Sequence, residues 1–197
     1  MIVLTKPNPD ILNRFLSSQA SLSFTYPEVG ASSGAPPTGY VIDRTRAKLG
    51  TGERVFVQAR SALSGWEQFR LGWVEAYSSS TLIEPGSSVA VMVNLAGLWW
   101  LNACRVIYVI DEVFPIQRFG FAYGTLPDHP ASGEERFLVE FDPADGVVWY
   151  EILAFSRPRG LRSRLGHRCM RRIQKRFGKE SAAAMIRAAQ AGPEEEK

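Results

Sequence analysis

A change of hydrophobic period near residue 72 is the feature that most constrains this chain. From there on, apolar residues recur at every second position, which predicts six strands, over 73–77, 88–96, 98–111, 117–125, 134–142 and 146–156. The last two are the clearest, and the turn at 142–146 predicts that they form a hairpin. Six consecutive strands leave an apolar face that another element must cover.

The segment able to cover that face comes last. Between about Ser156 and Ala191 apolar residues recur at every fourth position, which predicts one long amphipathic helix with Leu161, Leu165, Cys169, Ile173 and Phe177 on its apolar half. A strand at 40–49 and two short helices, near Val55–Leu63 and Trp66–Phe69, precede the six strands. The predicted fold is α+β: a curved antiparallel sheet of about seven strands wrapped around a long C-terminal helix, with two short helices after the first strand.

The N-terminal part differs in composition. Residues 8–20 predict a short helix, and a segment rich in Gly, Pro and Ser follows at 24–39 and predicts a long loop. We therefore divide the chain into an N-terminal extension (1–38), the sheet-and-helix domain (39–191) and a tail (192–197).

Composition narrows the class of protein. Cys104 and Cys169 are too few for a disulfide framework in 197 residues, so we expect reduced thiols and a cytoplasmic protein. The first ten residues do not have the pattern of a secretory signal. Residues 85–104 carry no charge, but Asn94, Asn102 and Gly97 favour two strands joined by a turn over a transmembrane helix.

Charge is distributed unevenly. Residues 157–179 contain ten Arg or Lys and no acidic residue, although the whole chain has a net charge of only +3. This basic helix face could contact nucleic acid, lie against an anionic membrane, or be a solvated outer face that forms ion pairs with the acidic sheet or with a partner subunit, as in a homodimer; we favour the solvated face. Its lack of aromatic residues disfavours nucleic acid, because bases stack on aromatic rings.

The densest local pattern is FGFAYGTLPDHPASGEERF at 119–137. His129 lies between two prolines and precedes Glu134 and Glu135, so it could act as a general base beside a carboxylate in a hydrolase, dehydratase or cyclase. The alternative, which we favour, is a rigid turn in which His129 bonds to backbone. Two histidines without HxH or CxxC spacing predict no metal site, and no glycine-rich phosphate loop or other cofactor motif is present.

Aromatic residues of the strands suggest a second kind of site. Together with a few polar groups they could line a cavity between sheet and C-terminal helix that binds a small apolar or amphipathic molecule; the candidates are Phe121, Tyr123, Trp149, Glu151 and Arg157. The same rings could instead fill the core. The sequence favours such a binding protein over an enzyme, with an interaction module using the basic helix as a third hypothesis.

Several segments resemble a known family. The 119–137 block, with TYPEVGA at 25–31, GWEQFRLGW at 65–73 and AFSRP at 154–158, resembles a bacterial and plant domain of unknown function over residues 24–185. The resemblance implies that His129, Glu134, Glu135, Ser156 and Arg157 recur in similar sequences, but it implies no activity, substrate or cofactor. The order of elements also resembles the helix-grip fold of the START and birch-pollen-allergen superfamily, in which a cavity lies between sheet and last helix.

Overall fold

The computed structural model of the protein describes residues 1–78, 82–159 and 167–191. Its elements, in chain order, are β1 (Ile2–Val3), α1 (Pro9–Gln19), the 3-10 helix η1 (Ala31–Ser33), β2 (Val41–Thr51), α2 (Glu53–Ser64), the 3-10 helix η2 (Glu67–Phe69), β3 (Val74–Ser78), β4 (Ser88–Leu95), β5 (Leu98–Glu112), β6 (Gln117–Thr125), β7 (Ala131–Asp142), β8 (Val147–Pro158) and α4 (His167–Gln190).

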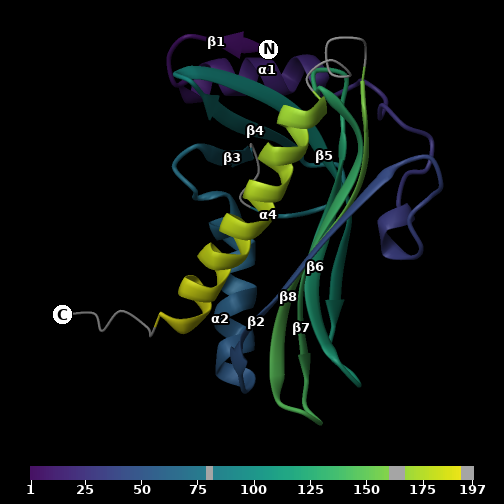
Figure 1. The fold of residues 1–197 in the computed structure, drawn as a ribbon, viewed down its shortest axis with the longest axis vertical. Helices are drawn as coiled ribbons and strands as arrows, with labels where there is room; N and C mark the ends of the chain where they lie inside the picture. The colour runs from purple at the N-terminus through teal and green to yellow at the C-terminus, as the bar shows by residue number, and fades with distance from the viewer. Residues whose placement is uncertain (79–81, 160–166, 192–197) are drawn as a thin grey trace.

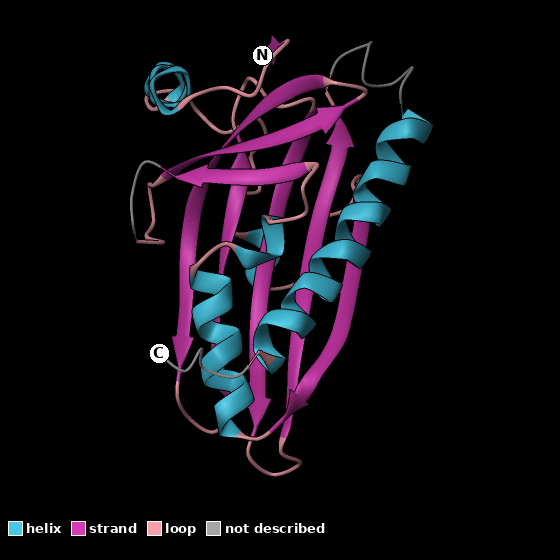
Figure 2. Cartoon of the chain, turned by 90° about the vertical axis from the view of Figure 1, so that its left-hand side faces the viewer, coloured by secondary structure: helices cyan, strands magenta, loops and turns pink. Residues whose placement is uncertain are grey.

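The strands form one antiparallel sheet in the order β2-β8-β7-β6-β5-β4-β3, and β1 pairs with β5. The sheet is curved, and α2 and α4 lie on its concave side (Figures 1 and 2). This arrangement confirms the predicted helix-grip fold, and each predicted strand is present with bounds that differ by a few residues at most. The sequence did not predict β1, because two residues carry no periodic signal.

Alternate residues of the strands build the concave core. Phe137, Val139 and Phe141 of β7 are buried there, next to Phe121 of β6 and Tyr150 of β8. The rings of Phe69 (η2) and Phe177 (α4) pack on Phe137 with centroids 5.4 and 6.4 Å apart. Burial of one such ring contributes about 2 to 3 kcal/mol to stability, so this cluster joins η2 and α4 firmly to the sheet.

Helix α4 differs from its prediction in two ways. Strand β8 extends to Pro158, so the helix does not begin at Ser156. In the predicted apolar stripe, Cys169 is exposed, while Leu161 and Leu165 lie outside the described residues. A spacing of four advances about 40° per step around a helix, so the stripe drifts away from the core. The buried positions come later, at Ser181, Ala182, Ala184, Met185 and Ala189.

The N-terminal segment packs on the same sheet from the convex side. Leu12, Phe15 and Leu16 of α1 form a second core with alternate residues of β4 and β5, among them Met92 and Trp99. The loop that contains η1 then crosses the convex face of β7 and β8, on the side away from α4 (Figure 1). Residues 1–38 therefore cover apolar surface that the helices on the concave side do not reach.

Candidate functional site

His129 lies in the turn between β6 and β7 and bonds to its own loop. The Ala131 amide N–H donates to Nδ1 at 3.0 Å. Burial lowers the pKa of His129 to about 4, so the ring is neutral at pH 7. Among the described residues, the hydrogen bonds of His129 reach only Ala131 and Leu126, and neither Glu134 nor Glu135 is a partner.

Glu134 projects from the convex face of β7 and holds the η1 loop. Its carboxylate accepts hydrogen bonds from Tyr26 Oη at 2.9 Å, from the Gly30 amide at 2.8 Å and from the Ser32 amide at 2.9 Å. The Ser32 hydroxyl also donates to it. Only 3% of Glu134 is exposed, so all of this bonding is internal. The arrangement is that of an anchor for the loop.

Glu135 points to the opposite side of the sheet, because successive residues of a strand alternate between faces. Tyr123 of the neighbouring β6 donates from Oη to its carboxylate at 2.6 Å. Burial raises the pKa of Glu135 to about 7, and the nearby charge of Asp43 acts in the same direction. The side chain nevertheless remains half-buried rather than closed off. A carboxyl that titrates near neutrality therefore lies on the apolar, concave face.

A rim of polar residues joins the sheet to the first turns of α4. Asp43 of β2 forms a two-point ion pair with the Arg171 guanidinium, and the Gln174 amide donates to Ser156 Oγ at 3.2 Å. Cross-strand pairing connects this rim to Glu135, since Ala154 of β8 lies opposite both Asp43 and Glu135. A small pocket with room for about one water molecule opens at this rim.

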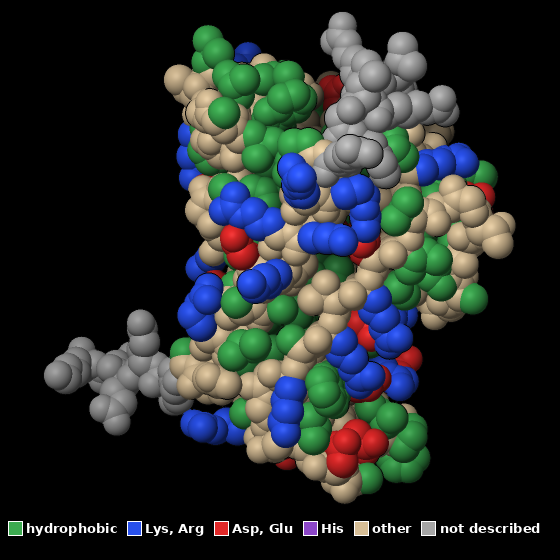
Figure 3. All heavy atoms as spheres, in the orientation of Figure 1, with side chains coloured by type: hydrophobic (Ala, Val, Ile, Leu, Met, Phe, Trp, Pro, Cys, Tyr) green, Lys and Arg blue, Asp and Glu red, His purple; other side chains and the backbone are tan. Residues whose placement is uncertain are grey.

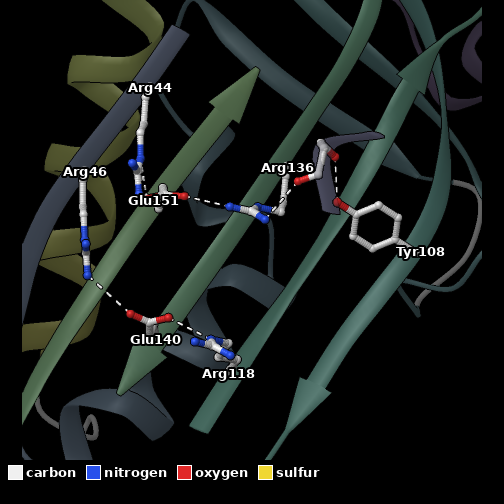
Figure 4. Close-up of polar contacts among 8 residues, drawn as sticks. Arg44, Arg46, Tyr108, Arg118, Arg136, Glu140 and Glu151 are labelled. Atoms are coloured by element: carbon white, nitrogen blue, oxygen red, sulfur yellow. Dashed lines mark hydrogen bonds and ion pairs between the residues drawn. The ribbon is translucent and has the colours of Figure 1, made fainter. Parts of the chain in front are cut away.

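The five predicted ligand-binding residues do not lie together. Phe121 and Tyr123 belong to the concave core. Trp149 and Glu151 are on the convex face, where Arg44 and Arg136 bond to the Glu151 carboxylate at 2.5–2.8 Å (Figure 4). The Arg157 guanidinium stacks on the Tyr40 ring at 4.7 Å.

The three predicted catalytic residues are also separated, into a turn, the convex face and the concave face. The structure instead brings together Glu135 and Tyr123 and places Asp43, Arg171 and Gln174 near them. Sequence reasoning missed the last three. Asp43 and Arg171 are 128 positions apart, and no local pattern connects residues at such a distance.

Neither a cluster of metal-ligating side chains nor a membrane-spanning helix is found in the described ranges. There, no group of three or more His, Cys, Asp and Glu side chains could hold a metal ion. No helix found among those residues has the length and hydropathy needed to cross a membrane.

Solved structures with a similar fold are very distant in sequence. Human STARD10 superposes with a TM-score of 0.50 at 10% identity, over 96% of this chain and 82% of that one. The Zhui aromatase/cyclase from Streptomyces sp. R1128 also gives 0.50 at 10% identity, over 77% of this chain and 93% of that one. At these identities the likeness concerns the fold alone.

Relatives are recognisable by sequence along the whole chain. A UPF0548 protein of Dictyostelium discoideum is 32% identical over an aligned length of 206 residues, and the alignment covers 95% of each chain. A UPF0548 protein of Deinococcus radiodurans is 34% identical over 201 residues, covering 96% of this chain and 99% of the relative. The family model described as Domain of unknown function (DUF1990) matches residues 25–184, and the chain belongs to that family.

Proposed function

We propose that this protein binds one small amphipathic molecule between the sheet and α4. The polar group of the molecule contacts the Glu135–Tyr123 pair, and its apolar part lies against the aromatic rings of the concave face. The observation that carries this proposal is the carboxyl of Glu135, half-buried on an apolar face with a pKa of about 7.

Comparison with the other buried carboxylates supports this role. Glu134 receives four hydrogen bonds and Glu151 is paired with two arginines, so both are satisfied by the protein itself. Glu135 has a hydrogen bond only from Tyr123 among the described residues. Burying a carboxyl with few partners is unfavourable, and such groups are found where a ligand supplies the missing contact.

Entry takes place at the first turns of α4, before Phe177. The contacts of these turns with the sheet include polar, partly exposed ones, such as Arg171 with Asp43 and Gln174 with Ser156. The later half is fixed by buried Ala182, Met185 and Ala189. Polar contacts at the surface exchange readily with water, so the first turns of α4 move away from the sheet while the later turns stay in place.

A second candidate is an enzyme that uses the same pair. General acid–base catalysis is most effective when the pKa lies near the working pH, and Glu135 meets that condition. As an enzyme, the protein would use Glu135 to transfer the proton and Tyr123 to position the Glu135 carboxyl, whereas His129 would have no role in catalysis. An enzyme would convert the bound molecule to a product, and Glu135→Gln would abolish this turnover while it still bound the molecule. Binding without turnover in wild type would leave the binding function alone.

The test uses N-phenyl-1-naphthylamine, an apolar fluorescent probe with one N–H donor. Wild type should bind one probe per chain in a saturable way. Ala154→Trp, which places a large side chain between Asp43 and Glu135 on the concave face, should abolish binding. Glu135→Gln should weaken it by about tenfold, the value of one hydrogen bond to a charged acceptor, and remove its dependence on pH near 7.

The matched control is Glu140→Gln, a change of the same type on the convex face of the same strand. It should bind the probe like wild type. Thermal melts must show that every variant is folded. Probe binding that is absent from wild type, or unaffected by Ala154→Trp in a folded protein, would refute the proposal.

A further inference from the structure

An exposed group of apolar side chains lies where β1 pairs with β5. Ile2 is 50% exposed, Leu4 80%, Leu98 37% and Trp100 37%. Ile2 is the cross-strand partner of Trp100, and Leu4 directly follows β1. We call these four residues the apolar patch. Leu98 and Trp100 belong to residues 85–104, and Ile2 and Leu4 belong to residues 1–5; neither segment carries a charged side chain.

The apolar patch is on the same side of the sheet as α4. Trp100 lies opposite Val93, whose side chain packs against the concave core, and opposed residues share a face. Trp99, the next residue, points to the other side and packs with α1. Exposed apolar surface of this kind, with an indole in it, is unfavourable in water unless something covers it.

A row of exposed cations lies on α4 nearby. Arg172, Lys175 and Lys179 are exposed, and their spacing of three and four places them along one stripe, which we call the basic stripe. None of the ion pairs found in the described part of the chain involves them. In Figure 3 Lys and Arg side chains gather over α4, and hydrophobic side chains gather above them, at the end where Figure 1 places β1.

Trp73 connects the two features. Its carbonyl accepts a hydrogen bond from the Asn94 amide at 2.7 Å, close to the β4–β5 turn. Its indole N–H donates to Glu180 of α4, and the Arg176 guanidinium lies over its ring at 4.3 Å. These contacts hold the middle of α4, which carries Lys175 and Lys179, beside the strands that bear the apolar patch.

We propose that the apolar patch and the basic stripe together dock on an anionic lipid bilayer. Phosphate headgroups attract exposed Lys and Arg, while an indole and aliphatic side chains partition into the interfacial layer. Nucleic acid would use the cations but leave Ile2 and Leu98 exposed. A symmetric dimer through the patch would bring two basic stripes close together, which like-charge repulsion disfavours.

The experiment is flotation of the full chain with vesicles of phosphatidylcholine, alone or mixed with an equal amount of phosphatidylglycerol. The chain should bind only the anionic vesicles, and less as salt is raised. Replacing the basic stripe (Arg172→Gln, Lys175→Gln, Lys179→Gln) should lower the apparent affinity by about 100-fold, since each cation near the surface contributes about fivefold. Leu98→Gln with Trp100→Gln should lower it by about tenfold.

Controls use matched residues elsewhere. Val113→Gln removes an exposed apolar side chain at the other end of β5, and Arg54→Gln removes an exposed cation of α2; both should bind like wild type. If the double patch variant does not fold, Leu4→Gln, at a highly exposed position, tests the patch alone. Equal binding to both vesicle types, binding to duplex DNA in place of vesicles, or a dimer broken by Leu4→Gln would overturn the proposal.

Discussion

Replacement of Glu134 by glutamine tests whether this carboxylate is an anchor for the η1 loop. Glutamine has almost the same shape, but one of its two terminal groups is an NH2 donor. The Gly30 amide faces one oxygen of Glu134 and the Ser32 amide faces the other, at 2.8 and 2.9 Å. Whichever way the new amide turns, it opposes one backbone N–H, whereas the hydroxyls of Tyr26 and Ser32 can rotate.

The expected magnitude follows from these contacts. A buried N–H left without an acceptor costs about 1 to 3 kcal/mol, and the remaining hydrogen bonds lose the assistance of the charge. We expect Glu134→Gln to lower the free energy of unfolding by about 3 kcal/mol. For a chain of this length that corresponds to a fall in Tm of roughly 6 to 12 °C. The control, Glu140→Gln, breaks only partly exposed pairs with Arg46 and Arg118 and should cost under about 1 kcal/mol.

Urea denaturation followed by tryptophan fluorescence measures both variants. Limited proteolysis should also show faster cleavage within 24–39 for Glu134→Gln alone, because the loop loses its attachment. Equal stability of the two variants, with equal resistance of the loop to protease, would mean that Glu134 does not anchor it.

Three further predictions follow from the geometry. Burial raises the pKa of Glu135 above its unfolded value, so its contribution to stability is present at low pH and is lost as pH rises from about 4.5 to 7. Over that range the free energy of unfolding of Glu135→Gln should rise relative to that of wild type by up to about 3 kcal/mol, as measured by thermal melts. Burial lowers the pKa of His129, so wild type loses stability as pH falls from about 6.5 to 4. The free energy of unfolding of His129→Gln should therefore rise relative to that of wild type over that range. Gly133→Ala should unfold the chain or lower the free energy of unfolding by over about 3 kcal/mol, because a Cβ would lie 1.9 Å from the Phe155 carbonyl oxygen. A variant whose denaturation curves match those of wild type at every pH would contradict the corresponding prediction.

The sequence predicted the sheet and the C-terminal helix because both depend on periodicity. The period of two also implies that Glu134 and Glu135 point to opposite faces, so their common assignment to one catalytic site could have been rejected from the sequence. The structure shows the consequence: Glu134 bonds to Ser32 on the convex side, and Glu135 bonds to Tyr123 on the concave side.

Which face of a strand points to the helix is harder to predict. Trp149, Glu151 and Phe155 lie on one face of β8, because every second residue of a strand points to the same side. The sequence predicted Trp149 and Glu151 on the cavity side. Phe155 is fully buried, yet on the convex side, where Tyr26 and Tyr40 cover it with ring centroids 5.6 and 5.1 Å away. A loop rich in Gly and Pro gives no periodic signal of the surface it will cover, so the sequence could not reveal this second apolar layer.

The titration of Glu135 tests the central claim most directly. In protein labelled with 13C at glutamate carboxyls, the Glu135 resonance should have a midpoint near pH 7. Bound N-phenyl-1-naphthylamine should move that midpoint downwards, because its N–H stabilises the ionised carboxylate, while the Glu134 resonance stays unchanged. A midpoint at the ordinary glutamate value of about 4.3, unaffected by saturating probe, would contradict the account.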